Sequence, residues 1–450
     1  MADRAERVNT GRSVLSDLRS LAVHRGFRKL FAVRLVSQCG DGMFQVGLAT
    51  LFFFSPQNMA TAGGVAAAFA VLLLPFTVVG PFAGPLLDLW RRRQVLLLGN
   101  AVRVVLALVL AVLIASGGVG PAVYVLALVT LGVNRFLLSA LSAGLPRVVP
   151  REQLLIANTI TPTLGAVSAV AGAVLGFVIG VVVPEGGASD AAALVAAAAL
   201  FGAASALALR LGRDELGPTR RVDASRVGRQ VRATVHDMVD GARYLVRRGT
   251  PGLALGAMAA HRFLYGVNFL ALILISRNLL SDPADARAGL GTFALLTGIS
   301  FAGNGLAIVL TPIAHERMRP STWIAWCLGL GALSQVLLVV TAERGVVMVS
   351  AVLLGLSVQG AKIAVDTIVQ RDTDDGYRGR AFSLYDVLYN AAFVAAAALA
   401  ALALPDVGWS RPVFAVTALA YVALALGYRR GTGRLGDRPR PVLAVEHDPS

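Results

Sequence analysis

The stretch that decides the fold is GMFQVGLATLFFFSPQNMATAGGVAAAFAVLLLPFTVVGPFAGPLL (42–87), which contains no Asp, Glu, Lys or Arg. A helix that crosses a bilayer needs about 20 consecutive, mostly apolar residues, so this stretch is too long for a single span. The polar, proline-containing segment 55–58 is a turn signal that divides it. The sequence therefore predicts two membrane-spanning helices joined at this turn.

The composition of the whole chain supports the same conclusion. Of the 450 residues, 56% are hydrophobic and 15% are charged, whereas soluble proteins carry about 25% charged residues. This balance excludes a disordered chain, a disulfide-rich secreted module and most soluble enzymes. What remains is a membrane protein that crosses the bilayer many times.

Apolar length and turn signals along the chain predict an all-α membrane protein with twelve transmembrane helices in two six-helix halves. The spans are expected at 29–54, 62–87, 94–116, 121–145, 155–183, 190–210, 252–278, 289–313, 321–341, 345–369, 381–404 and 411–429. The halves are 29–211 and 252–429. They are preceded by an N-terminal segment (1–28), joined by a linker (212–251) and followed by a tail (430–450).

The net charge of +15 follows from the predicted topology. Most of the 41 Lys and Arg residues fall in the segments on one side of the twelve spans, and positively charged segments favour the cytoplasm. We therefore expect both termini and the linker to be cytoplasmic, in a multi-pass protein of the cell membrane. Topology accounts for the basic excess without nucleic acid as a partner. Segment 1–28 lacks the apolar core of a signal peptide.

The linker contains apolar residues at helical spacing, from Val227 to Val246, with arginines on the other faces. This pattern predicts an amphipathic helix. Such a helix lies either on the lipid of the inner leaflet or against the rest of the protein. The two halves also carry similar short basic turns, such as GPLLDLWRRR (84–93) and TPIAHERMRP (311–320), which indicates duplicated units.

The basic turn at 84–93 resembles the signature Gly-x-Leu-x-Asp-Arg-x-Gly-Arg-Arg of the major facilitator superfamily. The matching positions are Gly84, Leu86, Asp88, Arg92 and Arg93. Leu89 replaces the usual basic residue, and Arg91 replaces the usual glycine. The resemblance covers about residues 27–430. It implies an inner gate, in which Gly84, Asp88, Arg92 and Arg93 clamp neighbouring helix ends. The alternative is a basic cluster that only sets the topology.

Three further segments resemble the drug- and siderophore-exporting branch of that superfamily: FRKLFAVRLVSQCGDGMFQVGLA (27–49), LPRVVPREQLLIAN (145–158) and RGRAFSLYDVLYN (378–390). The family's proton antiporters also have a Gly/Pro-rich fifth helix. Here Gly165, Gly172 and Gly176 have similar spacing, but Ala173 stands where proline is usual. The resemblance implies export of a small organic solute by a protein that commonly works as a monomer.

Ionisable residues inside predicted spans are candidates for proton coupling, because burying a charge in lipid is costly. Asp41 is the first candidate for a proton-binding carboxylate, since burial favours its neutral form and a nearby arginine favours its charged form. Arg135 is its expected partner, because the family has an arginine in this part of helix 4. The alternative is a fixed structural pair. Lys362 and Asp366, four residues apart, share a helix face and form either a second coupling pair or a simple neutralising pair.

Polar residues within the spans are candidates for the lining of a solute cavity. They are Gln38, Gln45, Tyr265, Asn268, Asn304, Gln359, Tyr389 and Asn390. A mostly apolar pocket with a few polar groups suits an amphipathic organic molecule.

No motif in the sequence predicts a cofactor or a metal site. There is no P-loop for ATP hydrolysis and no His/Cys/Asp cluster with metal-ligand spacing. We therefore predict a secondary active transporter that exports an amphipathic solute in exchange for protons by alternating access, and not an enzyme. Two alternatives stay open: an uptake carrier for a small metabolite, and a membrane receptor or enzyme that transports nothing.

Overall fold

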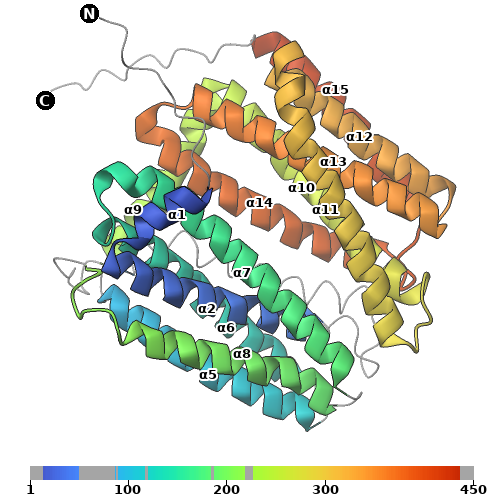
Figure 1. Cartoon of the computed structure of the whole chain (residues 1–450). Coiled ribbons are helices and arrows are strands. Elements are labelled where there is room, and N and C mark those ends of the chain that lie inside the picture. The colour runs from blue at the N-terminus through green and yellow to red at the C-terminus, as the bar shows by residue number, and fades with distance from the viewer. Residues whose placement is uncertain are drawn as a thin grey trace, which may run out of the picture. The chain divides into compact units, whose positions relative to one another are not determined.

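The computed structural model describes residues 14–49, 87, 90–116, 120–183, 187–217 and 227–435. In these ranges every regular element is a helix, as predicted for an all-α membrane protein (Figure 1). The described helices divide into two compact units. The first unit contains α1 (Val14–Ala22), α2 (Arg25–Ala49), α5 (Arg92–Ala115), α6 (Pro121–Gly144), η3 (Leu145–Arg147), η4 (Arg151–Gln153), α7 (Leu154–Val182) and α8 (Gly187–Ala208). The second contains α9 (Val227–Arg248), α10 (Thr250–Asn278), α11 (Ala286–Arg317), α12 (Pro320–Val340), α13 (Arg344–Asp372), α14 (Asp375–Ala403) and α15 (Arg411–Leu435).

Ten of the described helices, α5 to α8 and α10 to α15, are long and apolar enough to cross a membrane. Helix α2 is the predicted first span but is not among the ten, because polar residues such as Arg34, Gln38 and Asp41 lower its mean hydropathy. Each predicted span in the described ranges coincides with one helix. The predicted span at 62–87 lies outside the described residues, apart from Leu87.

The helices extend past the apolar segments that predicted them. Helix α14 begins at Asp375 and α15 ends at Leu435, each six residues beyond the predicted limit. The reason is that backbone hydrogen bonding continues through polar residues, whereas hydropathy marks only the part that fits in lipid. Helix α1 lies within the predicted polar segment 1–28 and was not predicted. Its Leu18 and Leu21 pack into the first unit's core.

Side chains are distributed as expected for a protein surrounded by lipid. Large apolar residues remain exposed on the spans, including Val112 (68%) and Val170 (64%). Charged residues such as Arg103 (1%) are buried between helices. A soluble protein of this size would bury most of its large apolar residues and expose most of its charged residues.

Glycines allow α2 and α7 to pack closely. A Cβ at Gly42 would collide with the Ala169 carbonyl, and one at Gly172 with the Cys39 carbonyl. Gly165, Gly172 and Gly176, which the family resemblance singled out, all face α2 residues. Small residues at membrane-helix contacts let backbones approach each other. The glycine pattern of this helix therefore serves the α2–α7 contact.

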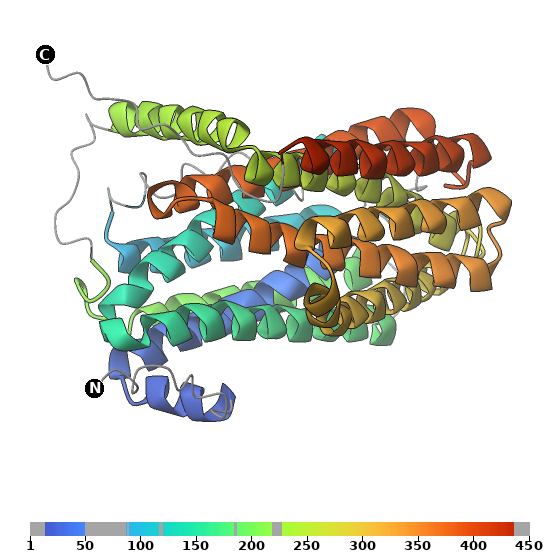
Figure 2. The same cartoon turned by 90° about the horizontal axis from the view of Figure 1, so that it is seen from above.

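The two units pack their helices in the same order. In the first unit α5 packs on α8 and α2 on α7, and in the second α12 packs on α15 and α10 on α14. These are the third and sixth, and the first and fifth, predicted spans of each half. The long helices of each unit run alongside one another in both views (Figure 2). Duplicated six-helix units would produce such repetition.

Helix α9 occupies the linker, where we predicted an amphipathic helix. One face packs on another helix of the same unit, α14: Tyr244 stacks on Tyr377 with ring centroids 4.0 Å apart, and Arg380 Nη2 lies 2.7 Å from Asp237 Oδ1. The other face exposes Val239 and Val246. The helix thus makes the protein contact that was one of the two alternatives, and leaves an apolar face uncovered by the described residues.

Candidate functional site

A buried ion pair joins α2 to α5 in the first unit. Asp41 of α2 is 4% exposed and Arg103 of α5 is 1% exposed, and the Arg103 Nη2 donates to Asp41 Oδ1. Burying two charges costs free energy that their attraction repays only when further hydrogen bonds satisfy both groups. The surroundings of this pair supply such bonds.

The surroundings are a polar network and one aromatic ring. Arg103 Nη1 donates to Ser37 Oγ at 3.3 Å, and Ser37 Oγ donates to Asn100 Oδ1 at 3.1 Å. The guanidinium carbon lies 3.6 Å from the centroid of the Phe201 ring, which comes from α8. A cation held over a ring face gains electrostatic stabilisation. Contacts from α2 and α8 therefore hold Arg103 of α5 in place.

The expected partner of Asp41 was wrong. The structure pairs Asp41 with Arg103, whereas Arg135 of α6 lines a cavity. The reason is the packing of the helices. Helix α2 packs extensively on α8, which also packs on α5, whereas α2 contacts α6 only slightly. Asn100 and Arg103 lie one helical turn apart, so they share a face of α5. This spacing is the one feature of the sequence that could have pointed to Arg103 as the partner of Asp41.

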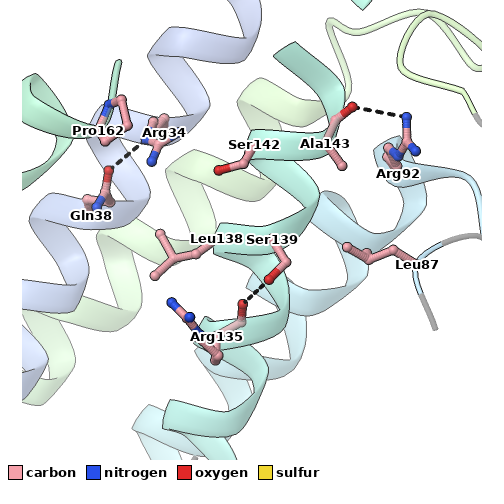
Figure 3. A pocket seen from close by; sticks show the side chains of 10 residues that line it. All are labelled: Arg34, Gln38, Leu87, Arg92, Arg135, Leu138, Ser139, Ser142, Ala143 and Pro162. Atoms are coloured by element: carbon pink, nitrogen blue, oxygen red, sulfur yellow. Dashed lines mark hydrogen bonds between the residues drawn. The ribbon is translucent and has the colours of Figure 1, made fainter. Parts of the chain in front are cut away.

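The cavity is a hollow of about 660 Å³ within the first unit. Ten of the described residues line it and are drawn in Figure 3; three of these are arginines and none is an acid. They are Arg34, Gln38, Leu87, Arg92, Arg135, Leu138, Ser139, Ser142, Ala143 and Pro162. The arginines come from three different helices, α2, α5 and α6, so only the tertiary fold brings them together.

Three of these residues belong to the predicted site: Gln38, Arg135 and, from the expected inner gate, Arg92. Gln38 was predicted to line a cavity and does line this one, where it accepts a hydrogen bond from Arg34 Nε at 3.0 Å. Gly165 of α7 leaves the room for that pair, because a Cβ there would collide with Gln38 Oε1. Arg135 was predicted to pair with Asp41 and instead lines the cavity.

The arginines of the expected inner gate bind backbone carbonyls at the ends of α6 and α8 and in the turn after α8. Arg92 Nη1 donates to the carbonyls of Ala143 and Leu216, each at 3.0 Å. Arg93 Nη2 donates to the Leu209 carbonyl at 3.2 Å. Cations at helix C-termini satisfy carbonyls that lack partners within the helix. Gly84 and Asp88, the other members of the expected gate, lie outside the described residues.

The second unit contains the pair Lys362 and Asp366 on α13. Lys362 Nζ donates to Asp366 Oδ2 at 2.8 Å, and the two side chains are 38% and 27% exposed. The predicted common face therefore brings the charges into contact. Both side chains are partly exposed, unlike those of Asp41 and Arg103.

Several other polar residues of the second unit join helices rather than line a hollow. His261 is fully buried and contacts Tyr421 Oη and Ser357 Oγ, each at 3.1 Å. Asn268 Nδ2 donates to Gln335 Oε1 at 3.2 Å and is 6% exposed. Asn268, a predicted cavity residue, is thus buried at a contact between helices.

Sequence reasoning missed an aromatic cluster around Arg262. The Arg262 guanidinium lies 4.2 Å from the ring centroids of both Tyr389 and Phe393, and 5.0 Å from that of Tyr265. Tyr265 and Tyr389 were predicted to line a cavity, and here they surround this cation. Of the remaining predicted residues, Gln45 is exposed, Asn304 and Gln359 are half-buried, and Asn390 Nδ2 donates to the Asp386 carbonyl at 2.8 Å.

No sequence model of a protein family matches the chain. Two curated relatives, described as uncharacterized MFS-type transporters of Mycobacterium tuberculosis and Mycobacterium bovis, are each 36% identical to it over 423 residues. The match covers 93% of this chain and 92% of each relative. The chain belongs to the major facilitator superfamily. This MFS protein is therefore a multi-pass membrane transporter and not an enzyme.

Solved structures of transporters share the fold of this MFS protein. A POT family transporter in complex with 5-aminolevulinic acid is 12% identical with a TM-score of 0.65, over 92% of this chain and 97% of that one. The nucleoside transporter NupG is 15% identical with a TM-score of 0.60, over 90% and 98% of the two chains. At such low identity these likenesses establish the fold alone.

Proposed function

We propose that this MFS transporter is a proton-coupled exporter of an amphipathic organic solute of the drug or siderophore class. It works as a monomer in the cell membrane, with both termini and the α9 linker in the cytoplasm. Its two halves alternate the exposure of a central site between the two faces of the membrane. Asp41 carries the exchanged proton, and Arg92 and Arg93 hold the inner gate.

The observation that supports proton coupling is the burial of Asp41 against Arg103. Protonation of Asp41 would leave Arg103 as an unpaired buried cation, and breaking a buried pair in this way costs about 3–5 kcal/mol. Proton binding therefore favours a conformation in which Arg103 has another partner. A ligand that binds two conformations unequally shifts their populations, which is what coupling requires.

The test uses everted membrane vesicles from cells that produce the full chain, with the lumen acidified. In this orientation a proton-coupled exporter accumulates its solute in the lumen. The probes are two fluorescent amphipathic dyes, the anion carboxyfluorescein and the cation ethidium. We expect accumulation of at least one dye that a protonophore abolishes and that vesicles without the protein lack.

Two variants test whether Asp41 carries the exchanged proton. Asp41→Asn is expected to remove pH-driven accumulation, and the matched control Asp282→Asn, an exposed loop residue, is expected to retain it. Accumulation that persists with the protonophore would contradict proton coupling. Dye accumulation in intact cells instead of everted vesicles would contradict export and favour the uptake carrier.

A further inference from the structure

Arg34, Arg92 and Arg135 line one cavity of the first unit. Among the lining residues that the structure describes there are three guanidinium groups and no carboxylate. Like charges around one cavity in a low-dielectric environment are unfavourable unless an opposite charge joins them. The cavity is thus suited to a ligand that supplies negative charge.

Arg34 is the lining residue for which a negatively charged partner is most clearly missing. Its side chain is 5% exposed, and the hydrogen bond that it donates within the described residues goes to the neutral Gln38 amide. Buried charges are normally paired with an opposite charge. No described acid forms an ion pair with Arg34, so a buried cation stands at the cavity wall without a countercharge from the described protein.

The remaining lining residues define the rest of the ligand. Leu87, Leu138 and Pro162 provide apolar surface, and Ser139 and Ser142 provide hydroxyl groups. A volume of about 660 Å³ lies within the range of about 300–1,000 Å³ that is typical of small-molecule sites. An anionic head and an apolar body both have matching surfaces here.

We propose that this cavity binds the carboxylate or phosphate group of an amphipathic organic anion, with Arg34 as its principal countercharge. This inference rests on the proposed function and names the charge class of the solute. The same chemistry is offered by a free organic anion and by an anionic lipid headgroup, and the experiment separates these sources.

The test measures binding to the purified full chain in the uncharged detergent dodecyl maltoside. Fluorescence polarisation reports carboxyfluorescein binding, with ethidium as the cationic comparison. Competitors are inorganic phosphate and the soluble lipids dihexanoyl phosphatidylglycerol and dihexanoyl phosphatidylcholine. We expect saturable binding of carboxyfluorescein that is much tighter than that of ethidium, and displacement by phosphate. Displacement by phosphatidylglycerol alone would support an anion site but overturn its assignment to the transported solute.

Three variants locate the site. Arg34→Gln is expected to weaken carboxyfluorescein binding at least tenfold, and Arg34→Lys is expected to retain most of it. Leu138→Trp, which fills the cavity and leaves the arginines in place, is expected to abolish binding. The control Arg229→Gln removes an exposed arginine of α9 and is expected to change nothing. Equal binding by Arg34→Gln and the parent chain would overturn the proposal.

A stability readout guards against misfolding of the variant. Without ligand, Arg34→Gln is expected to melt no lower than the parent chain, since it removes a buried cation that lacks a countercharge. Carboxyfluorescein is expected to raise the melting temperature of the parent and not of the variant. Anion binding without pH-driven transport would contradict the proposed function alone. Full pH-driven transport by Arg34→Gln would contradict the anion site alone.

Discussion

Asp41 and Arg103, 62 residues apart in the sequence, form an ion pair whose two side chains are almost completely buried in the first unit. The pair ties α2 to α5, and Phe201 adds α8 through its ring face. The pair therefore connects three helices and holds a charge that a proton can cancel.

The energetic coupling of Asp41 and Arg103 is the first prediction. Arg103→Gln leaves a buried carboxylate unpaired, and Asp41→Asn leaves a buried guanidinium unpaired, so each is expected to destabilise the protein by about 3–5 kcal/mol. The double variant is expected to be more stable than either single variant, because neither charge is then left alone. Melting temperatures in detergent measure this. Additive losses in the double variant would show that the two residues do not depend on each other.

Close packing of α2 and α7 makes a second prediction. Gly172→Ala puts a Cβ against the Cys39 carbonyl, so we expect a loss of about 1–3 kcal/mol, typical of overpacking. A Cβ at Gly180 on the same helix would meet open space, so Gly180→Ala is expected to be neutral or stabilising. The matched pair separates a steric effect from a general effect of glycine. Equal melting temperatures for the two variants would contradict the packing account.

The docking of α9 makes a third prediction. Tyr244 stacks on Tyr377 and accepts a hydrogen bond from the Asp374 backbone N–H at 3.0 Å, so Tyr244→Ala removes both contacts. Amide hydrogen exchange in α9 is expected to accelerate at least tenfold, with α10 unchanged. Val246 is 75% exposed, and Val246→Ala serves as the control. Unaltered exchange in Tyr244→Ala would mean that other contacts hold the helix.

The pair formed by Lys362 and Asp366 supplies a fourth prediction. Partly exposed ion pairs contribute about 0–1 kcal/mol, so Lys362→Met is expected to change the melting temperature little. Its transport then decides between the two interpretations of the pair. Unchanged pH-driven transport supports a neutralising role, and lost transport in a stable variant assigns the pair to coupling.

Hydropathy predicted the long helices well because lipid imposes a simple rule on length and composition. The helices α10 and α12 follow their predicted spans closely, since each begins and ends where apolar residues give way to polar ones. Helix α1 escaped prediction because it is short and lies in a segment that is polar overall. Its apolar residues are held by tertiary packing.

Contacts between helices could not be predicted from one sequence. Asp41, Arg103 and Arg135 were all visible as charges within spans, but hydropathy does not specify which helices are neighbours. For this reason the sequence analysis expected Arg135, and not Arg103, as the partner of Asp41. The cavity could not be predicted for the same reason. Arg34, Arg92 and Arg135 are distant in the sequence, and only the fold brings them to one place.

The most direct test of the central claim, that Asp41 carries the exchanged proton, is the proton flux itself. Proteoliposomes that contain the purified chain and the trapped pH indicator pyranine report proton movement when a transported dye is added. The account predicts dye-dependent proton movement for the parent chain and Asp282→Asn, and none for Asp41→Asn, although that variant still exchanges dye for dye. Dye-dependent proton movement in Asp41→Asn at the rate of the parent chain would contradict it.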